Sequence, residues 1–359
     1  MFCIAAFIVF AILSVFSATY RPLAAKAWHC VIRRVTFRPC DISFSDEVKG
    51  RLIGKMILTH PRWARFLDRW IDWLAFAFVL LSIWSVVYLA VAGLNLWVWG
   101  TCRPANVESC SLSGEACGVN KYQINLLDAV REGRIGEWAV APFAQFAETV
   151  SRIPDRLKRW EAADYLPPTA TYSLPKDPTK PYALEVLDPG CTFCRKLLSN
   201  IQSAGFENRY NFTYILYPIP DAKKDTGYKF AKSLLLAQTI EAVKMVPLKT
   251  NSKSIPPDWQ LLEIIFNRFD PDGLDLQTKF NIAFTTEQAQ ARLKELLKEI
   301  GYGPADITKI TRLAAGDDVI HSLSEQKEIV ENRLHTIKIP TLVFDGRRYD
   351  RVVDVKTLK

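Results

Sequence analysis

The sequence predicts an α/β domain with a helical insertion, over residues 182–359, preceded by two transmembrane helices. Three observations carry this prediction. A strand-like run, Tyr182–Leu187, leads into a Cys-x-x-Cys pair, Cys191 and Cys194, and then into a helix-like run over residues 195–201. Apolar residues recur at intervals of three and four through most of the C-terminal part. Two stretches in the N-terminal part carry no charged residue.

The two uncharged stretches are residues 1–20 and 73–101. The second has 29 residues without a charge and places Trp97 and Trp99 near its end, which is typical of a membrane helix with an aromatic belt. The first can also span a bilayer with little tilt, and we predict it to be the first transmembrane helix. No basic residue precedes its apolar run, so a cleaved secretory signal is the weaker alternative.

The charge between these stretches predicts the topology. Residues 18–72 hold 11 Lys and Arg against 5 Asp and Glu. Short loops with such a basic excess stay in the cytoplasm, so residues 21–72 form a basic cytoplasmic loop and everything after residue 101 lies outside. We therefore predict a multi-pass protein of the plasma membrane. Attraction to anionic membrane lipid accounts for the overall charge of +8, and nucleic-acid binding is not expected.

Cysteine usage bears on the same topology. Cys30 and Cys40 fall in the basic loop, and we expect them to stay reduced. The loop of residues 102–120 contains three more cysteines: Cys102, Cys110 and Cys117. Two of these are expected to pair with each other, and the third either meets Cys3 or stays free. Transfer of electrons between this group and Cys191 is an alternative to a purely structural disulfide.

Residues 121–181 connect the loop to the C-terminal domain. Residues 121–166 look helical and amphipathic, with aromatic residues among charges, and we expect them to lie along the membrane or on the domain. Prolines then recur up to Pro181, which predicts a stiff, extended tether.

The Cys-x-x-Cys pair predicts redox chemistry. A helix beginning at Cys191 would stabilise its thiolate, the species that attacks disulfides. Glu185 lies six residues earlier between apolar neighbours, where a buried acid could exchange a proton with Cys194. The alternative places Glu185 on the wet face of an edge strand. A zinc site would need two further ligands, and no second pair or nearby His supplies them, so we expect no metal and no cofactor.

A second segment, residues 336–347, contains Ile339 and Pro340 at the start of a β-branched strand that ends in an Asp-Gly turn signal. Together with the Cys pair and Glu185, this ordered set resembles the thioredoxin-fold thiol-disulfide oxidoreductases, and most closely their bacterial DsbA-like branch. The resemblance covers about residues 168–359. It implies a cis bond before Pro340, which would then face Cys191.

The resemblance also implies the roles of the site residues. Cys191 would be the exposed nucleophile, Cys194 the resolving thiol, Glu185 the group that assists proton transfer, and Pro340 the residue that orients the substrate. Three further residues would contact the substrate: Ile339, through its backbone, together with Thr192 and Phe193.

The 145 residues between Cys194 and Pro340 exceed what a minimal thioredoxin fold needs. After a strand over residues 212–218, periodicity and prolines predict five helices in an insertion at about residues 221–334. The predicted helices cover residues 228–245, 259–269, 286–300, 306–314 and 319–334. Two features depart from the resemblance: neither His nor Pro lies between the two thiols, and hardly a turn of helix follows the last strand.

The sequence thus predicts a membrane-anchored, extracytoplasmic thiol-disulfide oxidoreductase that exchanges disulfides with protein thiols or disulfides. A membrane redox partner would recycle it. The same residues would serve a reductase or an isomerase, because direction depends on potential and partners. A non-catalytic scaffold that only binds chains is the alternative of another class, although such a module needs no second thiol.

Overall fold

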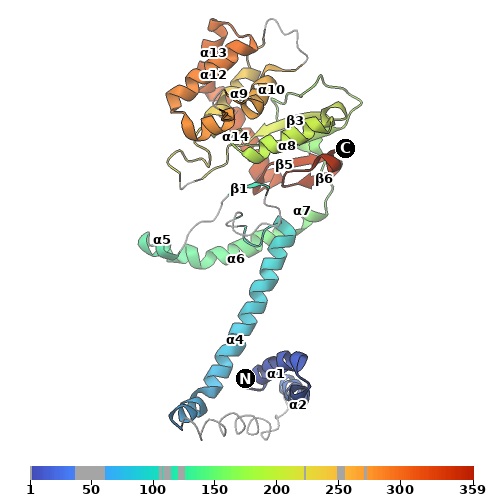
Figure 1. Cartoon of the computed structure of the whole chain (residues 1–359), viewed down its shortest axis with the longest axis vertical. Helices are drawn as coiled ribbons and strands as arrows, with labels where there is room; N and C mark the ends of the chain where they lie inside the picture. Colours follow the sequence, from blue (N-terminus) through green and yellow to red (C-terminus); the bar gives the residue numbers. More distant parts are fainter. Residues whose placement is uncertain are drawn as a thin grey trace. The chain divides into compact units, whose positions relative to one another are not determined.

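The computed structural model describes residues 2–36, 61–104, 107, 115–119, 126–221, 224–248, 255–270 and 273–359 (Figure 1). The chain divides into two compact units, Met1–Val91 and Ala92–Lys359. The second unit contains all of the predicted site residues.

The N-terminal unit begins with a helical hairpin. Helix α1 (Phe2–Phe16) and α2 (Arg21–Val35) are joined by a 3-10 turn, η1 (Ala18–Tyr20), and Cys30 is buried where the two helices pack. We expected Cys30 to be a reduced thiol in an open loop, and this is wrong. It lies at a helix–helix contact and is disulfide-bonded. Cys40 also lies outside the described residues.

Helix α4 (Pro61–Trp99) contains the predicted second span. Its part Trp73–Trp99 has 27 residues and a mean hydropathy of 2.4 in its most apolar window, which suffices to cross a membrane by length and composition. Two spans were predicted, but this is the one such helix in the described part of the chain. The 15 residues of α1 rise only about 22 Å at the usual helical spacing. That falls short of a hydrocarbon core of about 30 Å.

The C-terminal unit is built on a four-stranded mixed sheet in the order β3-β2-β5-β6. The central strand β2 (Tyr182–Leu187) is parallel to β3 (Asn211–Leu216) and antiparallel to β5 (Thr341–Phe344), which pairs with β6 (Arg347–Tyr349). The bounds of β2 are those predicted. The strand predicted to run to residue 218 stops at Leu216, before a proline that has no N–H for a strand ladder.

Two helices pack against each other beside this sheet. Helix α8 (Thr192–Ser203) follows the Cys pair and buries Leu197, Leu198 and Ile201 in the core, which also contains the strands. Helix α15 (Val355–Leu358), which contacts α8, has only four residues. The last helix is thus as short as the sequence indicated.

The helical insertion lies between β3 and a short strand, β4 (Lys338–Ile339), and its helices group together in Figure 1. Each predicted helix has an observed counterpart, with ends that match in one helix and differ by up to five residues in the others. The elements are α9 (Ser233–Lys244), α10 (Pro257–Asn267), α11 (Leu276–Thr278), the π-helical η5 (Lys279–Ala283), α12 (Thr286–Ile300), α13 (Pro304–Ala314), α14 (Asp317–Glu328) and the π-helical η6 (Ile329–Leu334). The bounds of α12 match the prediction because Thr285 and Gln288 form a capping box and Gly301 ends the helix in a left-handed conformation.

Helix α14 connects the insertion to the outer strand of the sheet. The side-chain oxygen of Gln326 accepts a hydrogen bond from the Leu216 N–H at 2.8 Å, so it satisfies a donor on the edge strand β3. The Gln326 amide donates in turn to the Glu241 carboxylate at 3.1 Å, and the Ser322 hydroxyl donates to the same carboxylate at 2.7 Å. Buried polar groups therefore fix the insertion against the sheet.

The predicted amphipathic segment is broken into short pieces: α5 (Leu126–Arg131), α6 (Ile135–Ser151), α7 (Ile153–Leu157) and the 3-10 turn η3 (Ala162–Tyr165). The break after α5 falls at Gly133, which has a φ of 68°. The end of α4 contacts α6, because the Trp99 indole donates to the Thr149 hydroxyl at 3.1 Å. That hydroxyl donates to Asn95 at 2.8 Å.

Candidate active site

Cys191 lies where strand β2 gives way to helix α8. It is the N-cap residue of α8 and has an extended backbone. Its N–H donates to the carbonyl of Asp188 at 2.9 Å, which closes the turn between strand and helix. The Cys191 sulfur is therefore held at the positive end of the α8 dipole.

The pKa values of the two thiols of the pair are shifted in opposite directions. Burial would raise the pKa of Cys191, but hydrogen bonds outweigh burial and hold that pKa well below its ordinary value. The donors are the thiols of Cys117 and Cys194 and the N–H groups of Phe193 and Cys194. Burial raises the pKa of Cys194 well above its ordinary value, and its hydrogen bond to Cys191 adds to the rise. Cys191 is thus the nucleophile of the pair, and Cys194 keeps its proton.

The predicted exposure of Cys191 is wrong. Both Cys191 and Cys194 are 0% exposed. Phe230 packs so closely on Gly190 that a Cβ there would lie 2.6 Å from that of Phe230, and strand β1 (Cys117–Gly118) brings a third thiol onto the Cys191 sulfur. No local pattern of residues indicates that distant segments cover the first thiol.

The residues between the two thiols lie at the surface of the unit. Thr192 is exposed, and Phe193 is half-buried and packs against the hydrophobic core. Their side chains are therefore within reach of a molecule that approaches the start of α8.

Glu185 lies in the middle of β2, between Tyr214 of β3 and Leu342 of β5. It is 0% exposed, and neither carboxylate oxygen has a hydrogen-bond partner among the described residues. Burial raises its pKa well above the ordinary value, and the charge of Cys191 raises it further. The alternative position on a wet edge strand is excluded, because β2 is an inner strand.

The segment around Pro340 lies beside the Cys pair. The Ile339–Pro340 peptide bond is cis, as predicted. The carbonyl oxygen of Ile339 lies 3.8 Å from the Cys191 sulfur. The backbone of β4 (Lys338–Ile339) is therefore next to the reacting atom, and it is paired with β1 rather than open.

Asp188 is a site residue that was not predicted from the sequence, although Asp-Pro-Gly is a turn signal. One of its carboxylate oxygens accepts from the Gly190 N–H at 2.7 Å and from the Ser233 hydroxyl, and the other accepts from the Ile219 N–H at 2.8 Å. Burial raises its pKa to about 7, against the effect of these hydrogen bonds. Asp188 thus joins the turn before Cys191 to two other segments of the unit.

Two amides of the insertion also reach this turn. The Gln277 amide donates to the carbonyls of Pro189 at 2.8 Å and Cys191 at 3.1 Å, and the Asn281 amide donates to that of Gly190 at 2.8 Å. No local motif marks either residue, because their function depends on tertiary placement alone. The insertion therefore fixes the backbone that carries Cys191.

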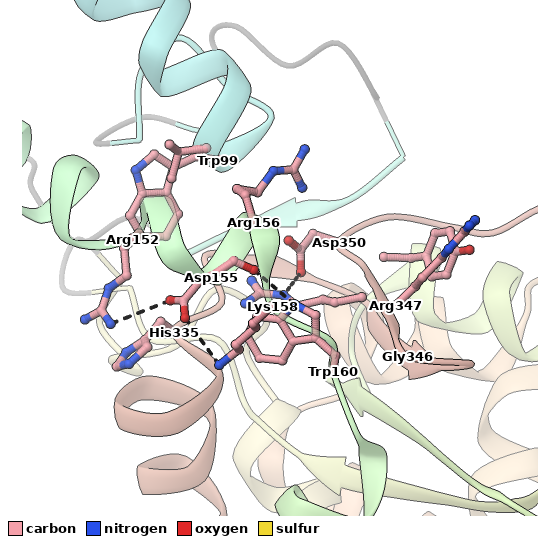
Figure 2. Close-up of a pocket in the computed structure, with 13 residues that line it drawn as sticks. Trp99, Arg152, Asp155, Arg156, Lys158, Trp160, His335, Gly346, Arg347 and Asp350 are labelled. Atoms are coloured by element: carbon pink, nitrogen blue, oxygen red, sulfur yellow. Dashed lines mark hydrogen bonds and ion pairs between the residues drawn. The ribbon is translucent and has the colours of Figure 1, made fainter.

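Within the described residues, no group of three or more His, Cys, Asp or Glu side chains could hold a metal ion. A cavity of about 220 Å³ lies elsewhere in the unit, lined by residues from α4, α7, β6 and the loops around them (Figure 2). In it, Asp155 lies 3.2 Å from the Lys158 ammonium and 3.8 Å from the Arg152 guanidinium. Its lining includes none of the three thiols near the start of α8, so it is separate from the redox pair.

The chain matches no family model and no curated protein sequence. Among solved structures, it is similar to the thiol-disulfide exchange protein alpha-DsbA2 from Wolbachia pipientis, with 15% identity, 52% of this chain and 83% of that chain covered, and a TM-score of 0.37. It is also similar to MdbA, a thiol-disulfide oxidoreductase from Corynebacterium diphtheriae, with 13% identity, coverage of 55% and 98%, and a TM-score of 0.38. The third is ScsC from Proteus mirabilis, with 14% identity, coverage of 65% and 91%, and a TM-score of 0.34. Likenesses this low carry no argument about activity, so the chemistry rests on the site itself.

Proposed function

We propose that this chain is a thiol-disulfide oxidoreductase that acts on protein thiols or disulfides through Cys191 and Cys194. One observation carries the proposal: Cys191 caps the start of α8 with its sulfur 3.8 Å from the carbonyl oxygen of Ile339, and hydrogen bonds at this position lower its pKa. A buried thiolate stabilised in this way is a nucleophile poised for disulfide exchange.

The proposed cycle donates a disulfide. A substrate thiolate attacks the Cys191 sulfur of the Cys191–Cys194 disulfide, and Cys194 leaves as a thiolate. A second substrate thiolate then attacks the substrate sulfur of the mixed disulfide, which forms the substrate disulfide and releases Cys191 as a thiolate. Two electrons pass from the substrate to the protein.

Glu185 would exchange a proton with Cys194 in this cycle. The charge of Glu185 raises the pKa of Cys194, so the two groups interact electrostatically. Burial raises the pKa of this carboxyl, and it has no hydrogen-bond partner in the described part of the chain, so it can give a proton to Cys194 as that thiol leaves and take it back when the disulfide reforms. Neither buried group then carries a charge for long.

The substrate would dock as an extended segment on the backbone of Ile339, with Pro340 shaping the surface and Thr192 and Phe193 in contact at the start of α8. A strand added at this place gains main-chain hydrogen bonds, which are independent of the substrate sequence. The docking geometry therefore suits many different protein substrates.

The acidity of Cys191 favours oxidation of substrates. Interactions that stabilise the reduced form of a dithiol make its disulfide a stronger oxidant, and the Cys191 thiolate is stabilised in the reduced form. A reductase or isomerase uses the same atoms in the other direction and is the nearest alternative. A non-catalytic binding module would have no use for the difference in acidity between the two thiols.

We propose that the apolar part of α4 anchors the chain in the plasma membrane of a bacterium, with the C-terminal unit on the outer face. The apolar length of Trp73–Trp99 and the basic residues before it support this topology. Helix α6 exposes Trp138, Phe143 and Phe146, as expected of a helix in contact with lipid. A membrane redox partner would reoxidise the pair, and a second span near the N-terminus stays a prediction.

The activity is tested with the full chain in detergent micelles. Its oxidised form should restore activity to reduced, unfolded ribonuclease A, and variants Cys191→Ser and Cys194→Ser should not. Binding of the unfolded chain without recovery of ribonuclease activity would favour the scaffold instead.

Topology is tested in intact cells with a membrane-impermeant amine reagent. It should label the exposed Lys309 and Lys356 of the C-terminal unit and leave the exposed Lys26 of α2 unlabelled until lysis. The reverse pattern would place the redox pair in the cytoplasm and contradict a role in oxidative folding.

A further inference from the structure

The docking backbone proposed above is already occupied by the chain itself. Strand β1 (Cys117–Gly118) pairs antiparallel with β4, with Cys117 opposite Ile339 and Gly118 opposite Lys338. The Val119 N–H extends the ladder by donating to the carbonyl of Ile337 at 2.8 Å. The segment thus lies where a substrate strand would lie.

The residue opposite Ile339 in this segment is a cysteine. Cys117 is a free thiol, is 6% exposed, and belongs to the same buried core cluster as Cys191 and Cys194. Its thiol donates a hydrogen bond to the Cys191 sulfur. A thiol placed opposite Ile339, whose carbonyl oxygen lies 3.8 Å from the Cys191 sulfur, can reach that sulfur without a large movement of the backbone.

Further contacts fix the segment of residues 115–119, which we call the cover strand. The Glu115 carboxylate lies 2.5 Å from the Lys196 ammonium of α8, and the Glu115 carbonyl accepts from the Val352 N–H at 3.0 Å. Gly118 packs on Val107, where a Cβ would lie 2.5 Å from that of Val107. The cover strand is therefore held at both of its ends.

We propose that Cys117 is a third redox cysteine, which occupies the substrate position and forms an internal disulfide with Cys191. This inference rests on the proposed thiol-disulfide activity. In the oxidised protein, the Cys117 thiolate attacks the Cys191 sulfur of the Cys191–Cys194 bond, the Cys117–Cys191 bond forms, and Cys194 leaves and takes up the proton that Cys117 lost. The step moves one disulfide among three thiols and needs no outside oxidant.

The internal disulfide has two consequences. It prevents a small thiol from staying attached to Cys191, because Cys117 displaces such an adduct and leaves the Cys117–Cys191 bond. It also makes a substrate compete with an internal thiol for the same sulfur and the same strand, so only a chain that displaces the cover strand completes the exchange. The site then discriminates between unfolded proteins and small thiols.

The test uses the full-length Cys194→Ala variant, which lacks the resolving thiol, and oxidised glutathione as the probe. Attack by Cys191 on glutathione disulfide forms a mixed disulfide and releases one glutathione thiolate. Cys117 should then attack the Cys191 sulfur, release the second glutathione and leave a Cys117–Cys191 bond. A positioned internal thiol has an effective concentration above the roughly millimolar value of flexibly tethered groups. The amount of Cys117–Cys191 cross-linked peptide should therefore exceed that of the Cys191–glutathione adduct by at least about tenfold at about 1 mM glutathione.

The matched control is Cys194→Ala with Cys117→Ser, which should accumulate the glutathione adduct on Cys191. Acid quenching, alkylation and peptide mapping distinguish the products. If Cys194→Ala keeps glutathione on Cys191 and an alkylated Cys117, the inference is wrong and the redox activity of Cys191 stands. If glutathione modifies Cys191 in neither variant, the proposed function fails as well. The unsubstituted chain, oxidised in the same way, gives a second readout and should yield Cys117–Cys191 peptide beside Cys191–Cys194 peptide.

Discussion

The two sides of Cys191 are built in different ways. On one side, the turn that carries the thiol is fixed by buried polar groups from several distant segments, including Asp188, Gln277 and Asn281; we call this turn and these groups the base. On the other side, the cover strand is held by the two-residue strand β1 and by a few contacts at its ends. Segments with few interactions open at low free energy, whereas fully bonded segments open only with the whole domain. We therefore expect the base to stay rigid and set the chemistry, and the cover strand to be displaced by a substrate.

The base is tested most severely by removing the nucleophile. Replacing Cys191 with Ser should reduce the disulfide-exchange rate to that of the uncatalysed reaction, because no other thiol lies at the start of α8 with a lowered pKa. The rate of ribonuclease A reoxidation measures this, and circular dichroism should show an unchanged fold. Replacing Ser203 with Ala, at the other end of the same helix, should leave the rate unchanged.

The next largest effect concerns Asp188. Replacing it with Ala leaves three donors without their acceptor: the N–H groups of Gly190 and Ile219 and the hydroxyl of Ser233. Each unsatisfied buried group costs about 1–3 kcal/mol, so the free energy of unfolding should fall by about 3 kcal/mol or more. Urea unfolding measures the change. The exposed Asp318 on α14 is the control, since its replacement with Ala should cost less than about 1 kcal/mol; equal losses in the two variants would mean that the turn is not fixed through Asp188.

A single methyl group added to the cover strand should make Cys191 more accessible. In Gly118→Ala, the added Cβ meets the Val107 side chain, so the cover strand docks less well. Overpacking of this kind costs about 1–3 kcal/mol, and the alkylation rate of Cys191 by N-ethylmaleimide should rise roughly tenfold. Gly136→Ala on α6 is the control, because a Cβ there meets nothing within 4 Å. The same alkylation rate in both variants would show that the cover strand does not limit access to Cys191.

The smallest effect is a shift of pH dependence. Because the pKa of Cys191 is lowered, its alkylation rate should rise with pH and level off below the ordinary thiol value of 9.0. The stability that this thiolate gives to the reduced protein is present above the ordinary pKa and is lost as pH falls through the lowered one. Cys194 should react only at higher pH. Titration of both thiols together near the ordinary value would contradict the difference in acidity.

The strand, the Cys pair and the helix start of the base could be predicted from the sequence, but the polar groups that fix its turn, and most of the cover, could not. Strand β2, the Cys pair and α12 follow from periodicity, spacing and capping residues, which act over a few positions. Strand β1 has two residues, one of them Gly, and its partner lies more than 200 positions away, so no local pattern marks it. The amides of Gln277 and Asn281 are likewise defined only by tertiary placement. Freedom from charge over residues 1–20 did not indicate that α1 ends at Phe16 and packs on α2.

The central claim is that Cys191 and Cys194 form a reversible and oxidising couple. Equilibration of the full chain with glutathione buffers of known ratio, followed by acid quenching and peptide mapping, gives the potential of that couple. The stabilised Cys191 thiolate predicts full interconversion of dithiol and disulfide at a potential less negative than about −180 mV, on the oxidising side of the isomerases and reductases. A pair that never forms a disulfide, or one with a potential near about −270 mV, would contradict the account.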